Sequence, residues 1–333
     1  MGRESIDLAR NENVVLKKGG LSLTLLPHLG GKIASLRVGE TELLQAPLLP
    51  YAPRTKTMDF NEADASGWDE CLPSVAACSV ALADGRTAQI PDHGDLWRVA
   101  WQPTGASEGT IRGECFSLPL VLVRSLAVSE TETDWGLRLH YTVTNRGTEA
   151  VPWSWAAHPL FAAAAGDRII LPDSINSLRL EGSGGHRLGK GGDTVSWPMA
   201  RLAAGGETDL SLAQSIESGI GDKLFAGPLS ADENWAVLDR PSAGLRIRVR
   251  FDSAATPYLG LWICYGGWPG RPGPKQMCVA LEPATAPVDS LAISGPWNRT
   301  LAPGERFSWD MSVSIEPLQP DPTHSNPTGQ AVC

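Results

Sequence analysis

Several features that define large classes of protein are missing from this sequence. No run approaches the roughly 20 apolar residues of a membrane-spanning helix, and no long segment has the apolar period of a helix. Cysteine is sparse and scattered, at positions 71, 78, 115, 264, 278 and 333, and no Cys-x-x-Cys pair occurs. These absences argue against a membrane protein, a zinc domain and a dense disulfide framework.

Positive charge is also in short supply. The 333 residues include 28 Lys and Arg against 37 Asp and Glu, which gives a formal net charge of −9 at pH 7. This balance disfavours nucleic acids and anionic membranes as partners. The segment Met1 to Leu16 is polar and charged, without the apolar core of a signal peptide. We expect a cytoplasmic protein, a monomer or homodimer, that binds a small molecule.

Glycine, proline and tryptophan are abundant instead, with 35, 26 and 12 residues. Gly and Pro favour tight turns, and the flat indole faces of Trp suit the C–H faces of sugars as well as a core. Leu21–Leu25 alternates strictly between apolar and polar residues, and Trp135–Thr144 and Leu245–Phe251 are also typical of strands. Short strand-like segments that follow one another closely along the chain predict an all-β sandwich or barrel with few or no helices.

The chain shows no internal division. We find no repeat and no linker between residues 20 and 315, so we predict a single domain over residues 1–316. Residues 317–333 are rich in Pro, Gln, Ser and Thr, cannot supply a packed core, and are predicted to form a disordered tail.

One carboxylate stands out by its position. Met277–Leu281 is apolar and is predicted to be a short buried strand that ends at Glu282. Pro283 should then prevent the strand ladder from continuing. A Glu held at a strand end beside a stiff loop is well placed to be a catalytic base, although a Glu that merely leaves the core for solvent would give the same pattern.

Two histidines share these surroundings. His93 lies in a Pro-Asp-His-Gly-Asp turn, where Gly94 permits a close backbone approach. His158 ends a Trp-rich run, and Pro159 fixes its backbone in the extended region. Two histidines and Glu282 suggest general acid–base catalysis, because His and a tuned Glu exchange protons near neutral pH. The remaining histidines are interpreted as structural or solvated: His28, His140, His186 and His324.

These motifs together resemble a known family. His158-Pro-Leu-Phe161 resembles the His-Pro-Tyr-Phe motif of aldose 1-epimerases (galactose mutarotases), and His93-Gly94 resembles their His-Gly motif. Leu281-Glu282-Pro283, with Pro287 and Asp289, resembles their Glu-Pro…Pro-Asp segment. The order and spacing of the motifs agree with this family from about residue 30 to about residue 315. The likeness is to a divergent bacterial subgroup of the family. The resemblance implies a large antiparallel β-supersandwich, in agreement with the strand count.

The resemblance also implies an activity, that of an isomerase which interconverts the anomers of a sugar. Glu282 would take the proton of the C1 hydroxyl, and His158 would protonate the ring oxygen as the C1–O5 bond breaks. The open aldehyde would rotate and close on its other face. No metal and no cofactor is implied.

The motifs give less support to the choice of substrate-binding residues. His93 would hydrogen-bond the sugar, and Asp222 is a loose match to the family's sugar-binding aspartate. The family's Asn-Arg loop has no clear counterpart, and Leu160 replaces the usual aromatic residue of its motif. Arg54 and Glu70 are candidates in place of that loop. Trp68, Trp262 and Trp268 are candidate stacking surfaces, although each would suit the core equally well.

Two alternatives remain open. A hexose-6-phosphate 1-epimerase would need an arginine cluster for the phosphate; Arg98 and Arg271 lie near the motifs, but no tight cluster is visible. A non-catalytic sugar-binding protein of the same fold would not need Glu282 and both histidines.

Overall fold

The computed structural model describes residues 13–319, and its regular elements are almost all strands. Within this range the helices are five 3-10 turns of three residues each: η2 (Pro27–Leu29), η3 (Phe60–Glu62), η4 (Leu96–Arg98), η5 (Gly184–His186) and η6 (Ile216–Ser218). None of these turns is long and apolar enough to cross a membrane. The prediction of an all-β protein with few or no helices is confirmed.

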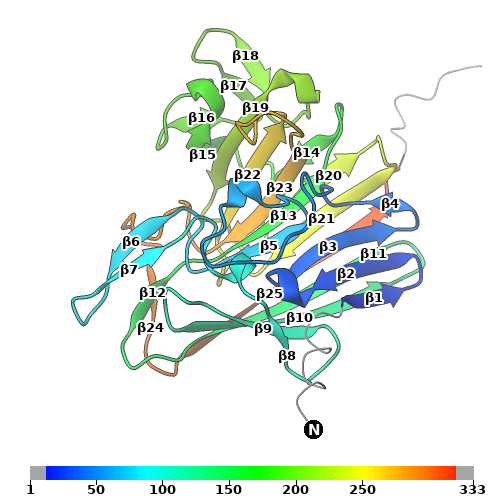
Figure 1. Ribbon diagram of the computed structural model, residues 1–333. Coiled ribbons are helices and arrows are strands. Elements are labelled where there is room, and N and C mark those ends of the chain that lie inside the picture. The colour runs from blue at the N-terminus through cyan, green and yellow to red at the C-terminus, as the bar shows by residue number, and fades with distance from the viewer. Residues whose placement is uncertain (1–12, 320–333) are drawn as a thin grey trace, which may run out of the picture.

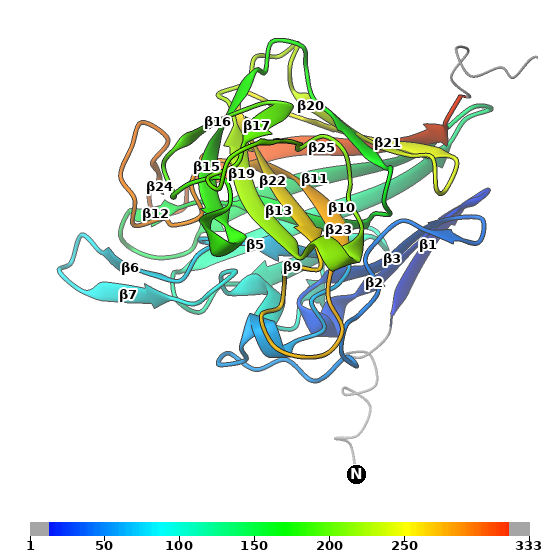
Figure 2. The ribbon, with the colours of Figure 1, turned by 90° about the horizontal axis from the view of Figure 1, so that it is seen from above.

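Most strands belong to two antiparallel sheets (Figure 1). The larger sheet has 11 strands in the order β1-β2-β3-β5-β13-β23-β22-β19-β15-β16, with β4 paired to β3. Figures 1 and 2 show β1 and β16 at its opposite ends. Its strands are β1 (Val14–Lys18), β2 (Leu21–Leu26), β3 (Lys32–Val38), β4 (Thr41–Glu42), β5 (Trp68–Cys71), β13 (Ala156–Ala162), β15 (Ser177–Ser183), β16 (Thr194–Ser196), β19 (Ile220–Ala226), β22 (Tyr258–Tyr265) and β23 (Met277–Ala284).

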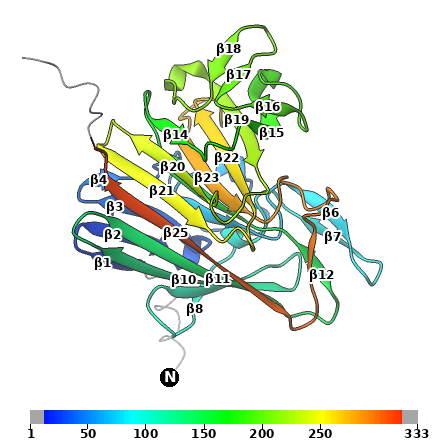
Figure 3. The same ribbon diagram turned by 180° about the vertical axis from the view of Figure 1, so that it is seen from behind.

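The second sheet has eight strands in the order β14-β20-β21-β25-β11-β10-β9-β8, seen from behind in Figure 3. Its strands are β8 (Gln102–Pro103), β9 (Thr110–Glu114), β10 (Leu120–Glu130), β11 (Trp135–Asn145), β14 (Arg168–Ile170), β20 (Trp235–Arg240), β21 (Leu245–Phe251) and β25 (Arg306–Pro317). Three two-stranded sheets complete the set: β6 (Cys78–Ala81) with β7 (Thr87–Ile90), β12 (Val151–Trp153) with β24 (Arg299–Leu301), and β17 (Met199–Arg201) with β18 (Glu207–Asp209).

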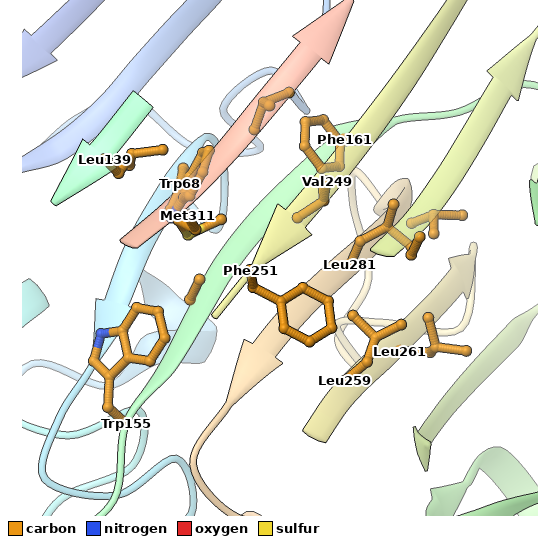
Figure 4. Packing of buried hydrophobic residues seen from close by; sticks show 14 of the residues in the cluster. Trp68, Leu139, Trp155, Phe161, Val249, Phe251, Leu259, Leu261, Leu281 and Met311 are labelled. Carbon is orange, nitrogen blue, oxygen red and sulfur yellow. The ribbon is translucent and has the colours of Figure 1, made fainter. Parts of the chain in front are cut away.

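The core lies between the two sheets. Strands of the second sheet alternate buried and more exposed side chains, as in β10, because successive residues of a strand point to opposite faces. Figure 4 shows Val249, Phe251 and Met311 of this sheet in one cluster with Leu259 and Leu281 of the larger sheet. The apolar faces of both sheets are therefore removed from water together.

The central strands of the larger sheet are buried on both faces. In β13, β22 and β23 nearly every side chain is buried, without alternation. One face packs on the second sheet, and the connecting loops cover the other. Polar residues on the covered face are thus held in a low-dielectric setting between a rigid sheet and its loops.

Some predicted boundaries were wrong. Strand β23 does not end at Glu282 but continues through Pro283 to Ala284. Its ladder with β22 is continuous, whereas the ladder with β13 is interrupted where Pro159 and Pro283 lack N–H groups. Strand β25 runs through Pro317, and the part of the predicted tail from 320 to 333 lies outside the described residues.

Candidate active site

A pocket lies over the loop-covered face of the larger sheet. About 560 Å³ of space lies within it, open mouth included. Strands β13, β19 and β22 and the loops that follow β4, β5, β7, β22 and β23 supply its walls. The lining residues are Phe60, Val75, Ala76, Asp92, His93, His158, Lys223, Trp262, Trp268, Gln276 and Asp289.

The strand register brings His158 and Glu282 together at this pocket. Ala156 pairs with Ala284 and Leu160 with Ala280, and the same register places His158 directly opposite Glu282. Residues opposite each other on antiparallel strands point to the same face. His158 Nε2 lies 3.9 Å from Glu282 Oε1, and the two side chains are 7% and 0% exposed. Glu282 lies just beneath His158, which lines the pocket.

Glu282 is held by a lysine from another strand. Lys223 Nζ donates a hydrogen bond to Glu282 Oε2. Gly260 is opposite Glu282 on β22, and a Cβ there would lie 3.2 Å from Oε2, so the glycine leaves room for the carboxylate. Burial raises the pKa of Glu282 above its ordinary value, although Lys223 opposes the rise. Within residues 13–319, Oε1 has no hydrogen-bond partner and is free to accept one from a ligand.

The surroundings of His158 favour its uncharged form. Burial, and after it the positive charges of His93, Lys223 and Lys32, lower the pKa of His158 well below its ordinary value. Its Nδ1 is buried and finds no partner in the described part of the chain. A buried carboxylate and a buried imidazole that both have unpaired atoms can exchange protons with a bound molecule.

His93 forms the wall beside His158. Its ring centroid is 5.1 Å from that of His158 and stacks at 3.7 Å on Phe60. Its Nδ1 lies 2.8 Å from the carboxylate of Asp92, which leaves Nε2 for a ligand. The backbone of His93 is left-handed, with φ of 57°, a conformation uncommon outside glycine and often found at functional sites.

Two indoles form an aromatic wall. Trp262 from β22 donates from Nε1 to the side-chain oxygen of Gln276 at 2.9 Å. Trp268, in the loop between β22 and β23, lies 5.9 Å from Phe60 between ring centroids. Both indoles are partly exposed in the pocket. The structure therefore places the predicted stacking residue Trp268 in the pocket with His93 and His158, whereas Glu282 lies beneath the lining.

Two predicted binding residues face the core instead. Trp68 is 0% exposed and packs in the buried cluster with Leu139 and Met311 (Figure 4). Glu70 is also fully buried and binds Arg124, Tyr141 and Trp155 between the two sheets. Both side chains point away from the pocket because they flank Asp69, the residue of β5 that is opposite His158.

Two further predicted residues are bound elsewhere. Asp222 is 0% exposed and accepts hydrogen bonds from Arg187 and Ser183 on the far side of β19. Arg54 binds Asp64 at 2.5 Å with its side chain 2% exposed. Neither residue lines the pocket. The predictions that they bind substrate are corrected on these grounds.

Sequence reasoning missed Lys223, the neighbour of Asp222. Strand neighbours point to opposite faces, so the charged side chain of β19 at the pocket is Lys223 and not the adjacent Asp222. The polar wall residues Gln276 and Asp289 were also missed as binding groups, and Phe60 gave no signal beyond a lone aromatic in a polar loop.

The arginines considered for a phosphate are occupied. Arg98 donates to the backbone carbonyls of Met58, Asp92 and Gly94 and packs its guanidinium on Trp97. Arg271 donates to the carbonyl of Asn61. Among the described residues that line the pocket there is no arginine. Over the same range, no group of three His, Cys, Asp or Glu side chains is placed to hold a metal ion.

Comparison with known proteins bears on the fold. No family model and no curated protein matches this sequence. Solved structures do match. One is a protein from Synechocystis sp. PCC 6803, with 18% identity, a TM-score of 0.67, and 95% of this chain and 100% of that chain covered. A galactose mutarotase-like protein from Lactobacillus casei ATCC 334 gives 17%, 0.63, 92% and 100% in the same order.

A third match is a galactose mutarotase related enzyme from Lactobacillus acidophilus, with 15% identity, a TM-score of 0.62, and 92% and 98% of the two chains covered. This chain has the galactose mutarotase-like fold. The expected antiparallel β-supersandwich is therefore confirmed. The reaction has to be argued from the site itself, because a fold can carry many activities.

Proposed function

We propose that this protein is an aldose 1-epimerase, an isomerase that interconverts the α and β anomers of a sugar. The observation that carries the proposal is the pair of Glu282 and His158, whose facing atoms lie 3.9 Å apart beside the pocket. The matches to galactose mutarotase-like structures support the same reaction class.

The chemistry consists of two proton transfers and one bond cleavage. The Glu282 carboxylate takes the proton of the C1 hydroxyl, and the freed electron pair forms the C1 carbonyl. The C1–O5 bond breaks, and O5 takes a proton from His158. After rotation about the C1–C2 bond, O5 attacks the other face of C1, and both protons return. The enzyme ends in its starting state, and no redox cofactor takes part.

The short distance between Glu282 and His158 suits this reaction. The two oxygens that exchange protons, O1 and O5, are bonded to the same carbon, so acid and base must be neighbours. Glycoside hydrolases instead place two carboxyl groups about 5–9.5 Å apart on either side of a glycosidic bond. A pair at 3.9 Å is too close for that arrangement.

The pair is active when it holds one proton in total. The proton can start on His158, beside a Glu282 carboxylate, or on Glu282, beside an uncharged His158. Either form can run the cycle, with the roles of acid and base exchanged between the two residues. Burial raises the pKa of Glu282 and lowers that of His158, so the two proton affinities approach each other. Proton transfer between groups of similar affinity is easy in both directions, as a reversible epimerisation needs.

The remaining walls would hold the sugar. Trp268 offers an apolar face for the C–H side of a pyranose, and His93 offers Nε2 for a hydroxyl. Asp289 Oδ1 lies 3.7 Å from Lys223 Nζ but accepts no hydrogen bond within the described structure, so it can accept one from a further sugar hydroxyl.

Polarimetry tests the proposal directly. Freshly dissolved α-D-glucose and α-D-galactose are followed with and without the protein, and Glu282→Gln serves as the inactive control. We expect faster approach to the anomeric equilibrium with the wild type only. No acceleration with these sugars or with glucose 6-phosphate, together with sugar binding measured by calorimetry, would overturn catalysis in favour of a binding protein.

A further inference from the structure

Lys223 is an unusual feature of this pocket. It is the one Lys or Arg among the described lining residues, and its side chain is 10% exposed. It comes from the middle of β19 and reaches past Gly260 to the carboxylate of Glu282. A long, flexible cation that is this deeply buried must be paired, because an unpaired buried charge is very costly.

Asp289 is its second partner. Lys223 Nζ lies 3.7 Å from Asp289 Oδ1. The backbone of Asp289 is fixed, since its carbonyl accepts from the N–H groups of Val75 and Ala76 at 3.0 and 2.8 Å. Its own N–H donates to Glu181 Oε1 at 3.3 Å. The backbone of Asp289 is therefore held in place next to the lysine.

We propose that Lys223 is a positioning residue, held between Asp289 and Glu282, that fixes the Glu282 carboxylate with Oε1 free for the C1 hydroxyl. The inference rests on the proposed epimerase function. By occupying Oε2, the lysine leaves a single carboxylate oxygen unpaired, and that oxygen is the one 3.9 Å from His158 Nε2. The geometry thus selects which oxygen acts as the base.

Lys223 also affects the charge of Glu282. The charged or titratable groups around this carboxylate are Lys223 from β19, His158 from β13, Cys71 from β5, Cys278 from β23, and His93 and Asp289 from loops. Both thiols stay neutral because burial raises their pKa values well above the ordinary one. Burial raises the pKa of Glu282, and of these groups Lys223 opposes that rise most strongly.

The lysine is a poor candidate for covalent chemistry. Burial lowers its pKa, but the charges of Asp289 and Glu282 outweigh that effect and raise the pKa above its ordinary value. A protonated amine has no free electron pair to attack the open-chain aldehyde of a sugar. Its role is therefore to hold the carboxylate rather than to form a Schiff base.

Two variants separate the hydrogen bond of Lys223 from its charge. In Lys223→Met both are lost, and we expect kcat to fall on the order of 10²-fold, the scale of a misplaced catalytic group, with a much smaller change in KM. Lys223→Gln keeps a donor without the charge and should recover part of kcat. In both variants the acid limb of the pH profile should move to higher pH.

Arg240→Met is the matched control. The Arg240 side chain is also 10% exposed and pairs with a buried carboxylate, Asp167, at 3.5 Å, but it lies outside the pocket. It should lose stability like Lys223→Met and keep the wild-type pH profile. Equal profiles in wild type and Lys223→Met, with unchanged kcat, would overturn the inference.

A readout independent of activity separates this inference from the proposed function. In protein labelled with ¹³C at Glu carboxyls, the Glu282 signal is assigned by its loss in Glu282→Gln. Removal of an adjacent opposite charge should raise the pKa of Glu282 by about 1–3 pH units in Lys223→Met. If Lys223→Met shows this pKa shift but the wild type accelerates no sugar, the Lys223–Glu282 relationship stands and the epimerase function is rejected. Acceleration without the shift would reject only the role of Lys223.

Discussion

His158 and Glu282 lie opposite each other on neighbouring strands, with Nε2 and Oε1 3.9 Å apart. The relationship joins residues 124 positions apart in the chain through a backbone register that continues on either side of them. Neither side chain depends on a mobile loop for its position. The first prediction follows from this arrangement.

Glu282→Gln and His158→Asn should each lose most of the turnover and remain folded. A positioned acid or base contributes about 10²–10⁴-fold to rate, so kcat should fall by that order in either variant. Both replacements keep the size and polarity of the side chain. Polarimetry measures the rate and circular dichroism the fold. Turnover equal to that of the wild type in either folded variant would remove that residue from the mechanism.

Epimerase activity should be higher at about pH 5 than at about pH 8, on either side of the ordinary pKa of histidine. The pair needs one shared proton, and a rise in pH removes it. Burial lowers the pKa of His158 well below its ordinary value, so His158 does not keep the proton at neutral pH. The measurement is kcat/KM against pH, with the spontaneous rate subtracted at each point. An increase of kcat/KM with pH across this range would contradict a shared proton.

Trp268 and Trp68 should respond differently to replacement by alanine. Trp68→Ala leaves a cavity in the core and should cost about 3–5 kcal/mol of the free energy of unfolding. Trp268→Ala removes a pocket wall and should raise KM with a smaller loss of stability. Urea unfolding and steady-state kinetics on both variants test this. The assignment of the two indoles would be wrong if Trp268→Ala were the less stable and Trp68→Ala the one with raised KM.

Asp64 should link stability to acid pH. Burial alone would raise the pKa of Asp64, but Lys32 and Arg54 outweigh it and lower the pKa from 3.8 to about 2. The stability gained is fully present above pH 3.8, the unfolded value, and is lost as pH falls toward 2. The difference corresponds to about 2.5 kcal/mol.

Urea unfolding between about pH 2 and pH 7 tests this linkage. Asp64→Asn should lack that part of the pH dependence, whereas Glu40→Gln, at an exposed carboxylate, should keep the wild-type curve. Parallel curves for Asp64→Asn and wild type would contradict the effect.

Much of this arrangement could be predicted from sequence. Short alternating strands and the absence of helical periods are local properties, and they predicted the all-β fold. Glu282, His158 and His93 were found because proline and glycine mark their positions and because their motifs resemble those of a family. Neither source of information required knowledge of the strand pairing.

The errors in choosing site residues arose at positions where strand pairing decides which face a side chain points to. Asp222 and Lys223 are adjacent and both charged, and only the register of β19 shows that the lysine faces the pocket. Trp68 stands beside a glycine, which suggested a loop, yet it lies in β5 and faces the core. The choice of Glu282 rested on a wrong reason, since Pro283 interrupts only the ladder toward β13.

The division of the pocket between strands and loops has a consequence for divergence. Glu282, His158 and Lys223 belong to the sheet, whereas Phe60, His93, Trp268 and Asp289 belong to connecting segments. Insertions and replacements in such segments are tolerated more readily than in a paired strand. Under the proposed function, related chains would change the sugar they accept while they keep the same strand residues for proton transfer, so similarity in the strands should be a poor guide to substrate.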